Sequence, residues 1–257
     1  MNTYFLKIID FVIQISFNQA ANSSIERVLK TYYKDYFVPE VTHPDLFVEV
    51  RSKYLFRTMK VKRATFMSLY YEEKPNKIIT SKSLNNIQAH FFLKTIIYNF
   101  LLERGIPLLH SSACLVNNKA VIFTGTNNAG KSTIVTMLKN TFTPLCDDMC
   151  ALKMDKSGKL FLYQVPYLEK NRYKKSNIGY PVGNIYFLKK SKVMEVKKIE
   201  LFKEPTYFGH VYEQVSIGLK KNISLKYIPL LRKKAYELSF SKNNGSDLIK
   251  YLLSRPS

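Results

Sequence analysis

Eight consecutive residues constrain this chain more than any other feature: residues 125–132 read Gly-Thr-Asn-Asn-Ala-Gly-Lys-Ser and fit the pattern G-x-x-x-x-G-K-[ST]. The glycines at 125 and 130 allow backbone angles that a side chain would forbid, so consecutive N–H groups can turn inward around a polyphosphate. An apolar, β-branched run (120–124) precedes this octet, and apolar residues at helical spacing (132–138) follow it. The order predicted is strand, loop and helix, with the helix N-terminus aimed at the anion. The alternative is a Gly/Asn turn that happens to precede a helix.

Composition and charge narrow the class of protein. With 257 residues, 46% of them hydrophobic, the chain can form one large domain or a small domain plus a larger one, and it is not expected to be disordered. Charged or amide side chains interrupt every hydrophobic stretch, so no membrane span is predicted and a cytoplasmic protein is expected. The three cysteines, Cys114, Cys146 and Cys150, are predicted to be buried reduced thiols rather than metal ligands.

The net charge of +21 includes three basic segments: Lys170–Lys175, Lys189–Lys198 and Leu231–Lys234. These segments are consistent with an acidic partner or a phosphate-bearing substrate, and equally with a generally solvated basic surface. The other lysines are spread along the whole chain, so nucleic acid is not the expected partner.

The first 80 residues read as a small α+β domain. Ser23 and Glu26 form a capping box that opens a helix reaching about Tyr36. The polar stretch Glu72–Ser83 contains Pro75 and reads as a linker. Strands of this domain are predicted at Phe11–Phe17, Leu46–Val50, Tyr54–Met59 and Thr65–Tyr71.

Residues 84–257 are predicted to form a larger α/β domain around a mixed sheet. Ser83 would cap a long amphipathic helix from Leu84 to about Arg104, and Gly105 and Pro107 would end it. Strands are predicted at Leu108–Val116, Met149–Met154, Leu160–Val165, Val182–Leu188, Met194–Ile199 and Ala235–Phe240, besides the run before the octet. Because hairpins are mixed with helices in this order, a mixed sheet is favoured over a purely parallel one.

Two adjacent acidic residues, Asp147 and Asp148, follow shortly after the octet. Phosphoryl transfer needs a carboxylate that holds Mg²⁺ and, where an alcohol attacks, a base that accepts its proton. Two neighbouring carboxylates can divide these tasks, although a solvated turn after Pro144 would give the same sequence. His110, at the start of the preceding strand, is a further candidate, but a single histidine in such a place is more often structural.

A family resemblance now becomes visible. The runs Leu109–Ala113 and Ala120–Gly125, the octet and the Asp-Asp pair together resemble the catalytic domain of HPr kinase/phosphorylase. That domain belongs to the same fold group as ATP-dependent phosphoenolpyruvate carboxykinase. The resemblance covers residues 108–155 well and extends more loosely to about residue 250. It implies a P-loop, kinase-like catalytic domain that follows the small N-terminal α+β domain.

The resemblance also implies an activity, namely ATP- and Mg²⁺-dependent phosphorylation of a serine hydroxyl on a small protein or peptide. Residues 1–80 and the segment Leu168–Tyr173 depart from the bifunctional enzyme. The chain is therefore more similar to shorter kinase-like relatives, some of which phosphorylate precursor peptides such as those of lasso peptides. Lys170–Lys175 is a candidate segment for capturing the acceptor or the transferred phosphate, with ordinary surface charge as the alternative. Relatives form oligomers, which leaves a homo-oligomer open here.

Site residues follow from the resemblance position by position. Lys131 would bind phosphate and take part in catalysis, and Ser132 would bind Mg²⁺. Asp147 is the preferred general base and Asp148 the preferred metal-side carboxylate, with His110 beside them, although the two aspartates can be exchanged. The nucleotide-binding set comprises Gly125, Asn127, Asn128, Ala129, Gly130, Lys131, Ser132 and Thr133.

Two other functions stay open. One is a kinase for a small hydroxyl compound such as free serine or a sugar alcohol. The other is a nucleotide-responsive binding protein whose basic surface engages nucleic acid or another partner. The paired aspartates count against the binding protein, because a pure binding module has no use for a base. No base-reading motif separates adenine from guanine.

Overall fold

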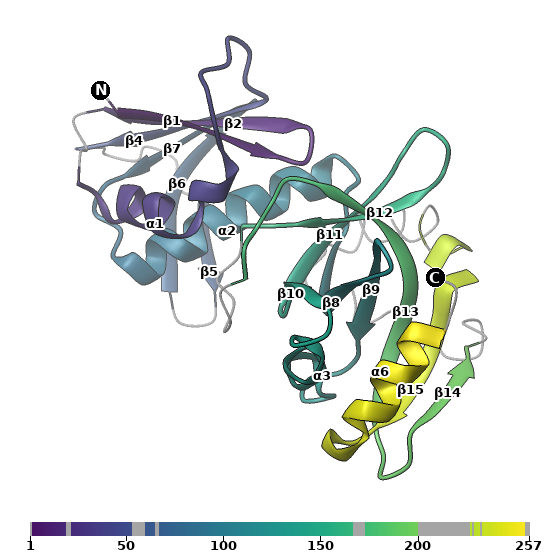
Figure 1. Ribbon diagram of the computed structural model, residues 1–257. Helices are drawn as coiled ribbons and strands as arrows, with labels where there is room; N and C mark the ends of the chain where they lie inside the picture. Colours follow the sequence, from purple (N-terminus) through teal and green to yellow (C-terminus); the bar gives the residue numbers. More distant parts are fainter. Residues whose placement is uncertain are drawn as a thin grey trace. The chain divides into compact units, whose positions relative to one another are not determined.

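The computed structural model describes residues 2–18, 22–52, 60–64, 67–166, 173–199, 227, 229–231 and 233–254 (Figure 1). The chain divides into two compact units, the first built mainly from residues 1–99 and the second mainly from residues 100–165 and 178–257. The predicted domains, 1–80 and 84–257, stay a prediction. Two further segments of the sequence analysis, the strand at Tyr54–Met59 and residues 170–172 of the basic segment, lie outside the described residues.

The first unit contains one seven-stranded sheet in the order β3-β1-β2-β4-β7-β6-β5. Its strands are β1 (Asn2–Ile8), β2 (Phe11–Asn18), β3 (Phe37–Val38), β4 (Leu46–Arg51), β5 (Lys60–Ala64), β6 (Met67–Lys74) and β7 (Lys77–Ser81). β1 and β2 form a hairpin in which Ile8 pairs with Phe11, and Ile9 in the tight turn has φ 61°. β2, β4 and β7 run parallel to one another, while β5 and β6 form an antiparallel edge.

Helix α1 (Ser24–Tyr32) begins where the capping box predicted it. The Ser23 side chain accepts a hydrogen bond from the Glu26 amide, and Ile25, Val28 and Leu29 are buried. The helix ends earlier than expected, because Tyr33 leaves the helical region at φ −115° and the short 3₁₀ turn η1 (Lys34–Tyr36) follows.

The prediction that Glu72–Ser83 is a linker is wrong, because β6 ends inside this segment and β7 occupies most of the remainder. Asn76, at φ 52°, forms the turn between them. Ile78, Ile79 and Thr80 are buried. The free energy gained by burying this strand in the sheet outweighs the preference of the polar residues around it for a loop. The strand β1 was also missed by the sequence analysis, since its pairing with β2 is visible only once the hairpin turn is recognised.

Helix α2 (Asn86–Glu103) begins among the residues of the first unit and ends among those of the second. Its cap is Asn85 rather than Ser83, because the Asn85 side chain accepts from the Gln88 amide at 2.9 Å. The Gln88 side chain in turn accepts from the Asn85 amide at 3.0 Å, which completes a reciprocal cap. Gly105, at φ 71°, follows the helix as the predicted stop signal requires.

The second unit is a mixed α/β fold, as predicted. Its elements are β8 (Leu108–Val116), β9 (Lys119–Thr124), α3 (Lys131–Leu138), β10 (Thr143–Cys146), β11 (Met149–Met154), β12 (Leu160–Gln164), β13 (Gly179–Lys190), β14 (Glu195–Lys198), β15 (Ala235–Phe240), η2 (Lys242–Asn244) and α6 (Gly245–Ser254). Pairings β8–β11, β11–β12, β12–β13, β13–β9 and β9–β8 close into a ring. β9, β13 and β15 run parallel, and the remaining pairings are antiparallel. The sequence analysis did not predict β10 or α6.

The core of this unit lies around α3. Ile134, Val135 and Leu138 on its buried face contact the side chains of β8 and β9, and α6 packs on α3. All three cysteines are buried and free, which confirms the expectation of reduced thiols. Across the described ranges, the structure contains no helix with both the length and the apolar character that a membrane crossing requires.

Glu26 is a buried carboxylate on α1 of the first unit. It accepts hydrogen bonds from the Tyr4 hydroxyl at 2.7 Å and the Asn22 amide at 2.8 Å, and its Oε1 lies 2.9 Å from Lys30 Nζ. Burial raises the pKa of Glu26, but the bonds from Tyr4, Lys30 and Asn22 outweigh burial and lower the pKa from 4.5 to about 2. A pKa that is lower in the folded state gives stability that is complete above the unfolded value and is lost as the pH falls toward the folded one.

We expect Glu26→Gln to lower the free energy of unfolding at about pH 7 by roughly 2–3 kcal/mol, because it removes the charge that these bonds stabilise. The variant should also lose less stability than the parent between about pH 4.5 and about pH 2. Urea unfolding across this range measures both effects. Glu40→Gln, at an exposed carboxylate, is the control. The same acid dependence in parent and Glu26→Gln protein would contradict the prediction.

Candidate functional site

The octet follows β9 directly and its last two residues, Lys131 and Ser132, begin α3, which gives the predicted order of strand, loop and helix. Gly125 has φ 151°, Asn128 has φ 64° and Gly130 has φ 107°, so the chain adopts a left-handed conformation three times within six residues. Space is restricted as well, because a Cβ on Gly130 would lie 2.9 Å from Cζ of Phe240. Both the angles and the available space therefore require glycine at this position.

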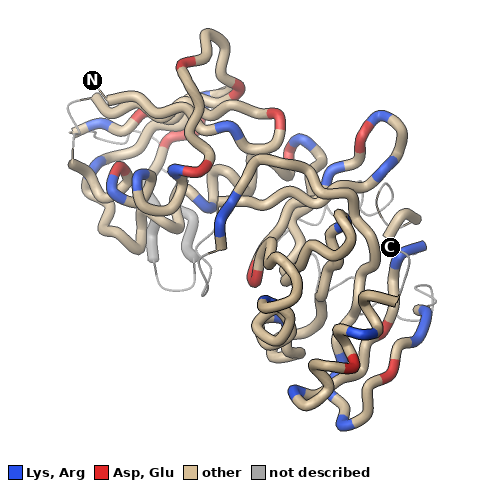
Figure 2. The backbone as a smooth tube through the Cα atoms, in the orientation of Figure 1, with Lys and Arg blue, Asp and Glu red and all other residues tan. Residues whose placement is uncertain are grey.

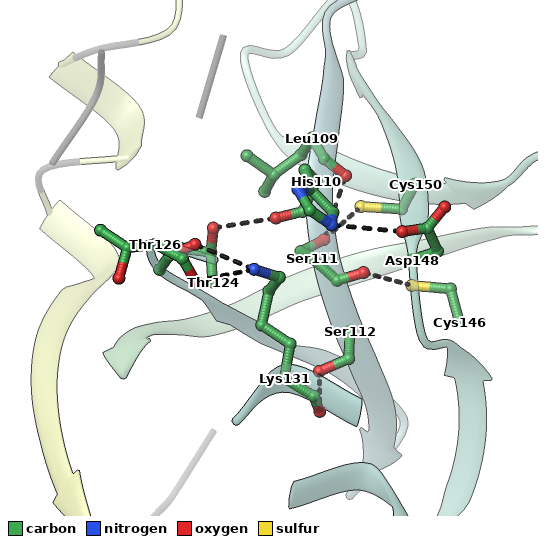
Figure 3. Close-up of polar contacts among 11 residues, drawn as sticks. Leu109, His110, Ser111, Ser112, Thr124, Thr126, Lys131, Cys146, Asp148 and Cys150 are labelled. Atoms are coloured by element: carbon green, nitrogen blue, oxygen red, sulfur yellow. Dashed lines mark hydrogen bonds and ion pairs between the residues drawn. The ribbon is translucent and has the colours of Figure 1, made fainter. Parts of the chain in front are cut away.

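The Lys131 side chain is almost fully buried and turns back into the loop (Figure 3). Its Nζ donates hydrogen bonds to the carbonyl oxygens of Gly125 at 3.0 Å and Thr126 at 3.1 Å. The Lys131 carbonyl accepts a hydrogen bond of 2.7 Å from the buried Ser112 hydroxyl on β8. These contacts hold the ammonium group inside the loop and fix the first turn of α3 to β8.

β8 is paired along both edges, and the site forms around its middle. On one edge Ser111 pairs with Thr124 at the end of β9, and the Thr124 hydroxyl donates to the His110 carbonyl at 3.1 Å. On the other edge the Ser111 amide donates to the Asp148 carbonyl at 3.1 Å. The loop and the acidic pair therefore flank the same three residues of β8, namely 110–112.

Asp147 and Asp148 form a bend between β10 and β11, which both pair with β8. The register shifts just before the bend, between Pro144 and Cys146, and is then kept across it, since Cys146 lies opposite Ala113 and Met149 opposite His110. Asp147 is 4% exposed, whereas the side chain of Asp148 is 37% exposed. The two carboxylates therefore have different access to solvent.

His110 and Asp148 contact each other, with His110 Nε2 3.2 Å from Asp148 Oδ1 (Figure 3). The His110 side chain is 36% exposed, so the pair can be reached from solvent. A neutral imidazole donates a hydrogen bond here, and a protonated one forms an ion pair. The predicted association of His110 with the acidic pair is thus realised through Asp148.

Two buried thiols contact Ser111, the residue that follows His110 on β8. The Ser111 hydroxyl lies 3.2 Å from Cys150 Sγ, and the Cys146 thiol donates to the Ser111 carbonyl at 3.7 Å. Both cysteines are fully buried. They fill the core on each side of the acidic bend and fix its position relative to β8.

Sequence reasoning missed Ser112 and Thr124, which connect the loop, β8 and α3. The available signal was a polar side chain inside an apolar strand, since such a group needs a hydrogen-bond partner once it is buried. In the nucleotide-binding set, Asn127 and Asn128 are exposed and Ser132 and Thr133 are half-buried. Ala129 is buried, and its amide donates to the Thr126 carbonyl within the loop at 3.2 Å.

A metal ion would find few protein ligands here. In the part of the chain that the structure describes, no group of three or more His, Cys, Asp or Glu residues could hold one. A Mg²⁺ ion would therefore use the Ser132 hydroxyl, one aspartate, phosphate oxygens and water, a ligand set that this hard cation accepts.

No protein-family model matches the chain, and no curated protein matches it. Among solved structures, a match is the HPr(Ser) kinase/phosphatase from Coxiella burnetii, with a TM-score of 0.31 and 13% sequence identity. It covers 57% of this chain and 93% of that chain. The likeness is too distant to carry an assignment, so the function is argued from the site.

Gly130→Ala should destabilise the second unit more than Gly158→Ala. Both glycines have positive φ, 107° and 83°, so alanine is strained at either position, by about 1–2 kcal/mol. Only at Gly130 would the new Cβ also meet a buried ring, that of Phe240. Urea unfolding of the two variants compares them directly. Equal losses would show that contact with Phe240 does not constrain the loop.

Proposed function

We propose that the second unit is an ATP- and Mg²⁺-dependent kinase that phosphorylates a serine hydroxyl on a small protein or peptide. The observation that carries this proposal is the position of the Gly125–Ser132 loop and the Asp147–Asp148 bend on opposite edges of the same short segment of β8. A phosphate donor held by the loop would then face carboxylates and an imidazole that can serve the acceptor.

The loop would hold the donor. Lys131 would exchange the carbonyl oxygens of Gly125 and Thr126 for phosphate oxygens, whose negative charge makes the bonds to the ammonium group stronger. The first turn of α3 contains no acidic residue, so the positive end of the helix dipole remains available to the phosphates. Ser132 begins this helix beside Lys131 and would ligate Mg²⁺, which shields the negative charge of the phosphates when it is bound.

The acceptor would lie on the side of Asp148 and His110. A base must reach the acceptor hydroxyl, and Asp148 is far more exposed than Asp147. We therefore assign Asp148 as the base and Asp147 to the metal side, the reverse of the order that the sequence favours. The Asp148 carboxylate would accept the hydroxyl proton while the serine oxygen forms a bond to the terminal phosphorus and the bond between that phosphorus and the ADP oxygen breaks. His110 orients the carboxylate and passes the proton to solvent.

Two alternatives make different predictions. A small-molecule kinase would use the same donor site with free serine or a sugar alcohol, so only the acceptor assay separates it from a peptide kinase. A nucleotide-responsive binding protein would bind ATP without transferring phosphate, and the accessible His110–Asp148 pair counts against it.

Phosphate transfer from labelled ATP to a panel of serine-containing peptides, to free serine and to water tests the proposal. We expect Lys131→Ala to reduce transfer by about 100-fold or more, because the donor loses its phosphate contact. Asp148→Asn should reduce transfer by about 100-fold or more while leaving ATP binding within about twofold. Removal of Mg²⁺ with EDTA should abolish transfer.

Asp155→Asn, at the exposed turn after β11, is the matched control and should keep full activity. Loss of transfer in Asp147→Asn but not in Asp148→Asn would reverse the assignment of the base. Nucleotide binding without transfer to any acceptor or to water, unaffected by either aspartate, would favour the binding protein over both kinases.

A further inference from the structure

Four lysines from four separate segments meet at the end of the second unit that is opposite the loop. They are Lys119 at the start of β9, Lys159 before β12, Lys198 at the end of β14 and Lys234 before β15. Sheet register brings them together, since Ala120 pairs with Val182, Phe161 with Pro181, Ala235 with Ile185 and Lys198 with Tyr236. Neighbouring strands are about 4.8 Å apart, so these residues form one group, the four-lysine cluster.

Polar contacts fix part of this cluster. Lys234 is half-buried, and its Nζ donates to the Val182 carbonyl at 2.8 Å. Lys198 Nζ donates to the Lys233 carbonyl at 2.5 Å and lies 4.2 Å from the centre of the Tyr236 ring. Two ammonium groups are thereby held in place on neighbouring segments.

Short turns position the other two lysines, Lys119 and Lys159. Asn117 and Asn118, at φ 48° and 60°, make the tight hairpin that places Lys119 at the start of β9. The turn before β12 places Lys159, whose Nζ lies 5.5 Å from the centre of the Phe161 ring. Both turns are short, so these positions are defined by the backbone of the sheet.

Ion pairs with described acidic side chains do not neutralise the cluster. Across the residues that the structure describes, none of the four lysines forms an ion pair with a carboxylate. Asp155 accepts hydrogen bonds from Ser157 and from the Lys159 amide within its own turn, and the charge of Lys159 helps to lower its pKa, but the two side chains form no ion pair. Glu195 pairs with Lys197, and Glu237 lies 3.9 Å from Lys189.

The positive charges of the four lysines therefore repel one another. Burial, followed by the charges of Lys119, Lys159 and Lys198, lowers the pKa of Lys234. Basic residues elsewhere are distributed over both units (Figure 2), so a high net charge alone does not explain a half-buried lysine facing three others. An anion bound here would relieve this repulsion.

We propose that the four-lysine cluster binds a small molecule that carries several phosphate groups, at a site separate from the loop. Ammonium groups bind phosphate as point charges, and several of them together suit a ligand that carries several negative charges. Because β9, β13 and β15 run parallel, their starts lie at the opposite end of the sheet from the loop that follows β9. The site therefore does not depend on the proposed kinase function.

Isothermal titration of the full chain with inorganic tripolyphosphate tests this site, with Lys131→Ala present in every protein to weaken binding at the loop. We expect Lys119→Gln/Lys159→Gln to lower the affinity by about tenfold or more. Lys119 is half-buried at the start of β9 and Lys159 is exposed before β12, so the fold should tolerate the change. Lys198→Gln is a further variant that leaves both turns intact and should also weaken binding.

Lys242→Gln/Lys250→Gln is the matched control, because it removes the same charge from exposed positions on η2 and α6. An equal loss of affinity in the two double variants, or no binding of tripolyphosphate in the Lys131→Ala protein, would overturn the proposal. Binding of a single-stranded oligonucleotide but not of tripolyphosphate would do the same. If the unmodified chain does not bind ATP, the kinase proposal is wrong. The outcome of the tripolyphosphate titration does not depend on that result.

Discussion

The pairing of β8 along both of its edges is the constraint on which the second unit depends. One edge holds β9 and the loop that follows it, and the other holds β10, β11 and the acidic bend between them. Ser112 connects β8 to the start of α3, and the Ser111 amide connects it to the Asp148 carbonyl. Since both connections lie in the interior, losing either would leave a buried polar group without its partner.

Burial makes this site rigid before any ligand arrives. Ser111, Ser112 and Thr124 are almost fully buried, and hydrogen bonds hold them to backbone carbonyl groups. The ammonium of Lys131 is likewise held by carbonyl groups of the loop. Side chains positioned in this way need little reorganisation when charge develops beside them, which is the usual source of electrostatic catalysis. His110 and Asp148, by contrast, are partly exposed, so this side of the site can be reached from solvent.

The parallel strands β9, β13 and β15 give the second unit two different ends. At their carboxyl ends lie the glycine-rich loop and the N-terminus of α3, where backbone N–H groups favour an anion. At their amino ends lysines supply the positive charge instead, from turns and strand ends that are far apart in the sequence. One sheet thus presents two anion-attracting regions built by different means, one from backbone geometry and one from side-chain charge.

Local features could be predicted from the sequence: the strand, loop and helix around Gly125–Ser132, the cap at Ser23 and the buried thiols. Glycine angles, capping bonds and apolar spacing act over a few residues, so such features can be read directly. Features that depend on the pairing of distant segments could not be predicted and are visible only in the folded chain. The tertiary structure made Glu72–Ser83 part of a sheet, gave Asp147 and Asp148 unequal exposure, and gathered the four-lysine cluster. Strand register sets these outcomes, and register depends on partners that lie far away along the chain.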